Sequence, residues 1–138
     1  MTRTAALRLG QARVIGGLKD STAATTNAAR PGTFRTNIGL VETEGKSVTA
    51  RVSVLFFDGR TLASGGAVAS KDYTLAPYEY RQLSAILAEV MGTATREANY
   101  GDLDNVQVRV EVIGGDGGLI VYASATDNGS GDTLLRVE

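Results

Sequence analysis

The stretch 127–132, DNGSGD, has residue types that bind calcium. Counted from Asp127, an EF-hand loop would need oxygen ligands at its first, third and fifth positions, glycine at the sixth and glutamate at the twelfth. The third and fifth positions are glycines, and the sixth is Asp132. Asn and Gly between two apolar runs are typical of a hairpin turn. The sequence therefore predicts a turn here, and no metal-ligating residues are expected.

A second candidate is the carboxylate pair Asp102 and Asp104, which stands just before an apolar alternating run. Two carboxylates on one face of a strand can perform acid–base chemistry. Aspartate is also frequent at the solvated entrance to a strand, and we favour that interpretation. No catalytic residue is predicted.

Four tyrosines could line a sugar-binding face: Tyr73, Tyr78, Tyr80 and Tyr100. The competing interpretation is structural, because tyrosine has an apolar ring with a polar tip and commonly bridges a core and solvent. We favour the structural interpretation and keep sugar binding as the alternative.

The composition excludes several chemistries. The 138 residues contain no histidine and no cysteine, which removes the common activated nucleophiles, the usual general base near neutral pH and thiolate metal sites. Tryptophan is absent and aromatic residues make up 6%, which weakens proposals built on stacking platforms. We therefore expect a protein that is not an enzyme and uses no cofactor.

Charge is distributed unevenly along the chain. Residues 1–35 hold six basic residues against one acid, and the remainder holds 8 basic and 14 acidic residues. The arginines are spaced singly without aromatic neighbours, so a nucleic-acid partner is not expected. Basic residues that alternate with apolar ones instead suggest an arm that lies on an acidic surface. Its candidate assembly residues are Ala5, Leu7, Arg8, Leu9, Arg13, Val14 and Ile15.

The length predicts one domain. We expect an N-terminal strand or arm at 1–16, a Ser/Thr-rich loop at 17–33 and a body at 34–138. No stretch approaches the roughly 20 apolar residues that span a bilayer, and residues 1–17 lack the apolar core of a signal peptide. Membrane insertion is not expected.

Alternation with a period of two dominates the body. Apolar residues recur at every second position in 34–40, 48–56, 106–112 and 119–125, which indicates half-buried strands. The glycine-rich stretch 114–118 predicts a hairpin between the last two of these. Residues 85–91 favour a short helix, with Ser84 as its N-cap and Gly92 as its stop. The predicted fold is all-β, an antiparallel β-sandwich with one short helix.

Three stretches together resemble an all-β module that recurs in secreted bacterial proteins: GTFRTNIGLVE, YTLAPYEYRQLSAIL and IVYASATDNGSGD. The resemblance covers about residue 12 to the C-terminus. It rests on turn and core positions, namely Phe34, Arg35, Thr36, Asn37, Pro77, Tyr122, Ser124, Asp127, Asn128 and Asp132. It implies an extracellular, non-catalytic sandwich. The loop before Gly32 and the ETEGKS turn depart from the pattern, so an inherited binding surface is not implied.

Two functional hypotheses follow. In the first, the protein is an extracellular structural module that assembles with itself, as a filament or surface-layer subunit, by adding its N-terminal strand to a neighbour. The same strand can instead belong to its own sandwich. In the alternative, the protein is a glycan-binding accessory module of a secreted protein that uses the tyrosines named above.

Overall fold

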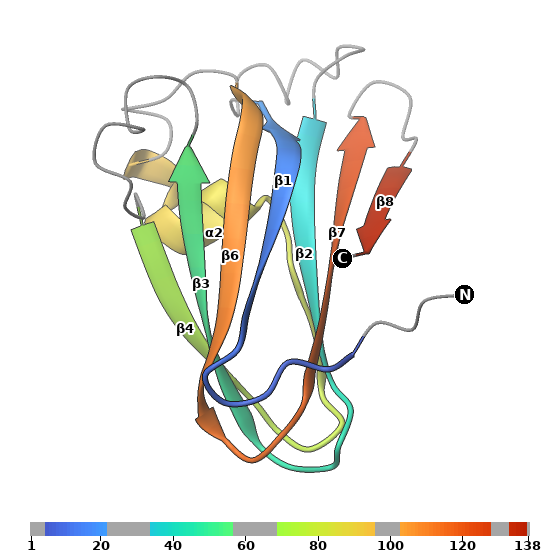
Figure 1. Cartoon of the computed structure of the whole chain (residues 1–138). Helices are drawn as coiled ribbons and strands as arrows, with labels where there is room; N and C mark the ends of the chain where they lie inside the picture. The colour runs from blue at the N-terminus through green and yellow to red at the C-terminus, as the bar shows by residue number, and fades with distance from the viewer. Residues whose placement is uncertain (1–4, 22–33, 57–68, 96–102, 128–132, 138) are drawn as a thin grey trace.

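In the computed structural model, two four-stranded antiparallel sheets pack face to face (Figure 1). The structure describes residues 5–21, 34–56, 69–95, 103–127 and 133–137. The strands are β1 (Ala12–Asp20), β2 (Phe34–Glu42), β3 (Val48–Phe56), β4 (Ala69–Leu75), β5 (Tyr80–Leu83), β6 (Leu103–Gly115), β7 (Leu119–Asp127) and β8 (Thr133–Val137), and a short helix, α2, spans Ile86–Met91. The predicted all-β sandwich with a short helix is confirmed.

One sheet has the strand order β1-β6-β3-β4 and is called the β3 sheet below. The other has the order β5-β2-β7-β8 and is called the β2 sheet. β6 and β7 therefore lie in different sheets, so the prediction that they form a hairpin is wrong. The glycine-rich turn between them has Gly115 at φ 84 and carries the chain across the sandwich. β7 and β8 pair antiparallel, and residues 128–132, where the sequence predicts a turn, lie outside the described part.

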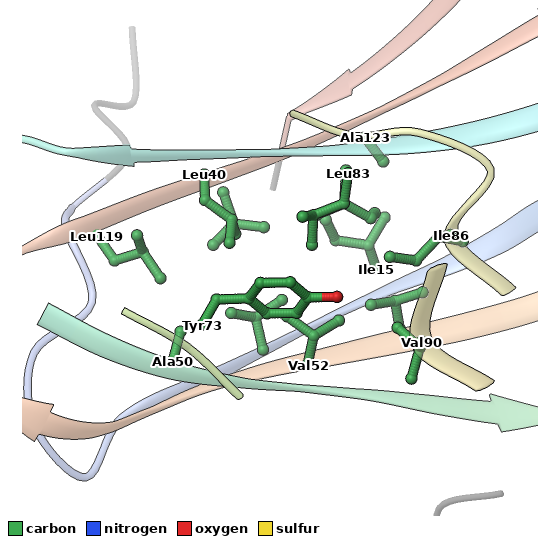
Figure 2. Close-up of a cluster of buried hydrophobic side chains, with 14 of the residues drawn as sticks. Ile15, Leu40, Ala50, Val52, Tyr73, Leu83, Ile86, Val90, Leu119 and Ala123 are labelled. Atoms are coloured by element: carbon green, nitrogen blue, oxygen red, sulfur yellow. The ribbon is translucent and has the colours of Figure 1, made fainter. Parts of the chain in front are cut away.

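The core forms where the inner faces of the two sheets meet. The alternation read from the sequence is confirmed at Val48, Ala50, Val52 and Val54 of β3 and at Val106, Val108, Val110 and Val112 of β6, all fully buried. Side chains from β2, β5 and β7 pack against them, as Figure 2 shows for Leu40, Leu83 and Leu119. Each buried aliphatic side chain contributes roughly 1.5–3 kcal/mol.

Helix α2 packs between the sheets and buries Ile86, Leu87 and Val90. The prediction of Ser84 as N-cap is wrong, because the residue in that position is Ala85, with φ 50 and no side-chain cap. Asn37 of β2 compensates, since its Oδ1 accepts the N–H of Ala85 at 3.1 Å. A partner from another element thus stabilises a backbone conformation that alanine rarely adopts.

The N-terminal segment touches both sheets. Leu7 pairs with Leu119 of β7 through two backbone hydrogen bonds of 2.8 and 2.9 Å. Residues 12–20 then pair with β6 and form one edge of the β3 sheet. Near the end of β1, the hydroxyl of Thr36 donates to the carbonyl of Lys19, which links this edge back to β2.

The boundary expected between an arm at 1–16 and a loop at 17–33 falls inside a strand. β1 continues to Asp20, with shifts in register around Ile15, Leu18 and Asp20. Gly17 has φ 69 within this irregular stretch, a conformation that glycine adopts without strain. Gly17, where the loop was expected to begin, therefore lies within an irregular stretch of the strand. The boundary expected at residue 34 coincides with the start of β2.

Candidate functional site

The outer face of the β2 sheet carries a patch of tyrosine and uncharged polar side chains. Tyr80 and Gln82 on β5, and Tyr122 and Ser124 on β7, occupy alternating positions opposite the buried ones. We call these four residues the tyrosine patch. The rings of Tyr80 and Tyr122 are nearly parallel, with an interplanar angle of 10° and centroids 6.4 Å apart.

The hydrogen bonds of the tyrosine patch form a chain in which Tyr122 donates to Tyr80 and Tyr80 donates to Gln82. The Tyr80 hydroxyl donates to Oε1 of Gln82 at 2.9 Å, and the hydroxyls of Tyr80 and Tyr122 lie 2.5 Å apart. Because the single proton of Tyr80 is already donated, the Tyr122 hydroxyl is the donor in the second bond. Burial, together with this bond to Tyr80, raises the pKa of Tyr122 to about 12. Tyr122 therefore stays neutral at physiological pH.

Gly39 of β2 makes this arrangement possible. It pairs with Tyr122 on one side and Gln82 on the other. A Cβ at this position would lie 2.1 Å from Cζ of Tyr122, so only glycine leaves room for the ring to lie across the strand. Glycine weakens a strand because it has no side chain to pack, and a neighbouring aromatic ring can compensate. The tyrosine patch therefore also has a structural role.

Glu42, the last residue of β2, is a buried carboxylate at the end of the sandwich where three turns meet (Figure 1). It is 1% exposed. Its two oxygens accept five backbone N–H groups at 2.6–3.1 Å, those of Glu44, Gly45, Lys46, Tyr78 and Gly118. These donors come from the β2–β3, β4–β5 and β6–β7 turns.

These bonds determine the charge state of Glu42. Burial alone would raise its pKa, but the N–H groups of Tyr78, Glu44, Gly118 and Gly45 outweigh burial and lower the pKa to about 2. A carboxylate with several N–H donors is strongly stabilised in its ionised form. Glu42 thus acts as a structural anion that ties the turns together, and it is a poor proton carrier near neutral pH.

Tyr73 lies inside the sandwich, contrary to its predicted place on a sugar-binding face. It is 6% exposed, with its ring among core side chains (Figure 2). Its hydroxyl donates to Oε1 of Glu89 at 3.0 Å, and Lys71 pairs with the same oxygen at 3.3 Å. Burial, followed by the bond to Glu89, raises the pKa of Tyr73. Tyr73 alternates with Asp72 and Thr74 along β4 and therefore points to the inner face of the sheet. From there it links β4 to α2.

Two of the other predicted tyrosines, Tyr78 and Tyr80, are described, and they lie in different settings. Tyr78 is 72% exposed, but it sits in the β4–β5 turn at φ 60 with its ring over Gly45. Tyr100 lies outside the described residues, and Asp102 and the side chain of Asp104 do as well. Of the three predicted tyrosines that the structure describes, Tyr80, half exposed, is the one that faces outward from a sheet. Among the described residues, the ring of Tyr80 is paired with that of Tyr122, which was not one of the four predicted tyrosines.

The predicted assembly residues divide into buried anchors and exposed positions. Leu7 and Ile15 are buried within this chain, whereas Leu9 is 62% and Val14 46% exposed. Ala5 is exposed and Arg13 half-buried. Arg8 pairs with Glu44 at 2.7 Å, so a basic residue of the leader does lie on an acidic turn of the same chain.

The outer face of the β3 sheet is charged. Arg51 forms a two-bond pair with Asp72 at 2.9 and 3.2 Å, and Arg109 contacts Glu111 at 3.1 Å. Within the described ranges, no cluster of three or more acidic side chains could hold a metal ion. No helix in that same part of the chain is long and apolar enough to cross a membrane.

Sequence reasoning did not place Glu42 or Tyr122 in a candidate site, although each left a signal. Glu42 follows Ile38 and Leu40 at the same period of two, which places a carboxylate on the inner face. Tyr122 alternates with Val121 and Ala123, which places its ring outside. Neither signal identifies a partner, because the partners lie on other strands and turns.

Neither a known protein family nor a curated protein matches the sequence. Among solved structures, the fold is similar to the crystal structure of Thermotoga maritima 1070, with a TM-score of 0.51 and 10% sequence identity. The match covers 91% of this chain and 90% of that chain. At this identity the similarity shows a shared fold and nothing about function.

Proposed function

We propose that this protein is a non-catalytic structural module that works outside the bacterial cell and assembles with itself by exchanging its N-terminal strand. The resemblance to modules of secreted proteins is what supports the extracellular location. The absence of a catalytic role is supported by how the titratable groups are used. Glu42 is engaged by backbone N–H groups, and Tyr73 and Asp72 are engaged by side chains.

One observation carries the assembly proposal: β1 is an edge strand whose inward-facing apolar side chains are buried by the rest of the sandwich. Ile15 and Leu18 are 0% and 2% exposed, and Leu7 upstream is 4% exposed. A second copy offers the same pockets and the same β6 edge. Exchange therefore preserves the contacts that stabilise the monomer, which is why it is a low-cost route to oligomers.

The connection to β2 is long enough for this exchange. Thirteen residues separate Asp20 from Phe34. An extended chain of this length spans up to about 45 Å, comparable with the width of a small domain. β1 can then be supplied to a neighbour while β2 stays in its own sandwich. Repeated exchange in one direction would build a filament.

Single-cysteine variants test the exchange directly, because the natural chain has no cysteine. Val14 and Arg109 are paired across β1 and β6. If Val14→Cys and Arg109→Cys chains are unfolded, mixed and refolded at high concentration under oxidising conditions, we expect a disulfide-linked heterodimer on a non-reducing gel.

The matched control mixes Val14→Cys with Asp72→Cys, whose new thiol would lie on β4 at the opposite edge of the same sheet. It should give no more heterodimer than random collision. The double variant Val14→Cys/Arg109→Cys in one chain locks β1 onto its own β6, and sedimentation should show it as a monomer. Equal cross-linking in both mixtures, or wild-type protein that remains monomeric at every concentration, contradicts strand exchange.

A further inference from the structure

The tyrosine patch has a chemistry that strand exchange does not use. Tyr80, Gln82, Tyr122 and Ser124 lie on the outer face of the β2 sheet, whereas β1 belongs to the other sheet. Tyr80 remains 51% exposed although its hydroxyl is hydrogen-bonded to both Gln82 and Tyr122. The patch is thus a rigid, partly exposed surface with fixed hydrogen-bonding groups.

Its polar groups retain bonding capacity. In the chain from Tyr122 through Tyr80 to Gln82, each hydroxyl proton is used, which leaves lone pairs on the Tyr122 oxygen as acceptors. Among the described residues, the amide nitrogen of Gln82 makes only a long contact of 3.4 Å to Ser84, so it can donate to a ligand. Acceptors and a donor therefore lie beside two nearly parallel rings.

We propose that the tyrosine patch binds a neutral oligosaccharide. A pyranose ring has an apolar C–H face that packs on an aromatic ring and a rim of hydroxyls that both donate and accept hydrogen bonds. Two parallel aromatic rings with an amide and hydroxyls at their edge complement both properties.

The absence of charge in the tyrosine patch favours a neutral oligosaccharide over a charged ligand. All four side chains of the patch are uncharged, whereas the outer face of the β3 sheet carries the Arg51–Asp72 and Arg109–Glu111 pairs. An acidic polysaccharide or a charged peptide would find no counter-charge among the four. A second copy of the chain is the remaining competitor, because tyrosines also form protein interfaces.

The test uses cellohexaose and chitohexaose as neutral probes and oligogalacturonate as an acidic control, measured by isothermal titration calorimetry. We expect weak, saturable binding of at least one neutral probe at millimolar concentration and none of the acidic one. Tyr80→Ala should weaken binding about tenfold or more, since the patch then loses a ring and the acceptor for Tyr122.

Tyr78→Ala is the matched control. It removes an even more exposed tyrosine two residues away, in a turn rather than on the patch. Binding should be unchanged in this variant. Circular dichroism and thermal unfolding confirm that each variant is folded, and Tyr80→Phe tests the hydroxyl with the ring retained.

The proposal is overturned if no neutral probe binds, or if Tyr78→Ala weakens binding as much as Tyr80→Ala. It is also overturned if Tyr80→Ala converts a wild-type dimer to a monomer while sugars have no effect, because the patch would then bind a second copy. The locked monomer Val14→Cys/Arg109→Cys should bind sugar like the wild type, which separates this test from that of strand exchange.

Discussion

The two sheets share a core but differ in how they use their polar residues. On the outer face of the β3 sheet, exposed charges pair across neighbouring strands, as Arg51 and Asp72 do. On the β2 sheet, the four side chains of the tyrosine patch are uncharged, and Glu42 at the strand end is buried and bonded to backbone. Exposed ion pairs are screened by water and contribute little, whereas buried polar groups are costly to leave unpaired. The β2 sheet should therefore be far more sensitive to polar substitution.

The largest expected effect comes from Glu42→Ala. This change leaves five N–H groups in three turns without their acceptor, so the protein should lose much of its free energy of unfolding. The matched change on the β3 sheet is Asp72→Ala, which breaks an exposed pair. Urea unfolding of both variants measures the difference. An equal loss of unfolding free energy in Glu42→Ala and Asp72→Ala would show that the two sheets do not differ in their sensitivity to polar substitution.

Glu42 also predicts how stability depends on pH. Its pKa is about 2 when folded and 4.5 when unfolded, so its contribution is complete above pH 4.5 and is lost as the pH falls towards 2. The wild type should lose stability steeply in that window. Glu42→Gln should be less stable at neutral pH and show a flatter profile between pH 4.5 and 2. Unfolding free energies across this range provide the check, with Asp72→Asn as the control for an exposed carboxylate.

A smaller effect is expected at two glycines that face outward from opposite sheets. At Gly39 a Cβ meets the Tyr122 ring, whereas at Gly114 it would lie 3.6 Å from Cβ of Thr49, an ordinary contact. Gly39→Ala should cost about 1–3 kcal/mol, since the ring must move and lose its bond to Tyr80. Gly114→Ala should be neutral or stabilise by about 0.4–1 kcal/mol.

Thermal unfolding measures both changes, and near-ultraviolet circular dichroism reports on the tyrosine rings. Displacement of Tyr122 should also bring its pKa back towards the usual tyrosine value, because both burial and the bond to Tyr80 are reduced. An unchanged tyrosine spectrum in Gly39→Ala would show that the ring does not depend on the glycine.

The smallest effect is expected from Arg51→Gln. Arg51 is about half exposed and its partner Asp72 similarly so. Water and salt screen such a pair, so the unfolding midpoint should stay close to that of the wild type. Any difference should shrink further at high salt. A large loss at Arg51 would mean that the charged face contributes to stability as much as the tyrosine patch.

The fold class could be predicted because alternation is a local property. The positions Val106, Val108, Val110 and Val112 alternate with Gln107, Arg109 and Glu111, and this pattern suffices to assign an inner and an outer side. The pairing of β6 could not be predicted in the same way. A glycine-rich turn fits both a hairpin and a crossing between sheets, and only long-range packing distinguishes them.

The candidate site shows the same division. By itself the sequence determined the side of the sheet to which each residue points. Glu42 points inward with Ile38 and Leu40, and Tyr122 points outward. It did not determine their partners. The N–H groups around Glu42 come from turns near residues 45, 78 and 118, and Tyr80 reaches Tyr122 across the intervening Gly39. Side-chain direction repeats every two residues along a strand, so the local pattern carries it. Contacts between distant segments depend on how the strands order and the sheets pack, and only the tertiary structure decided those.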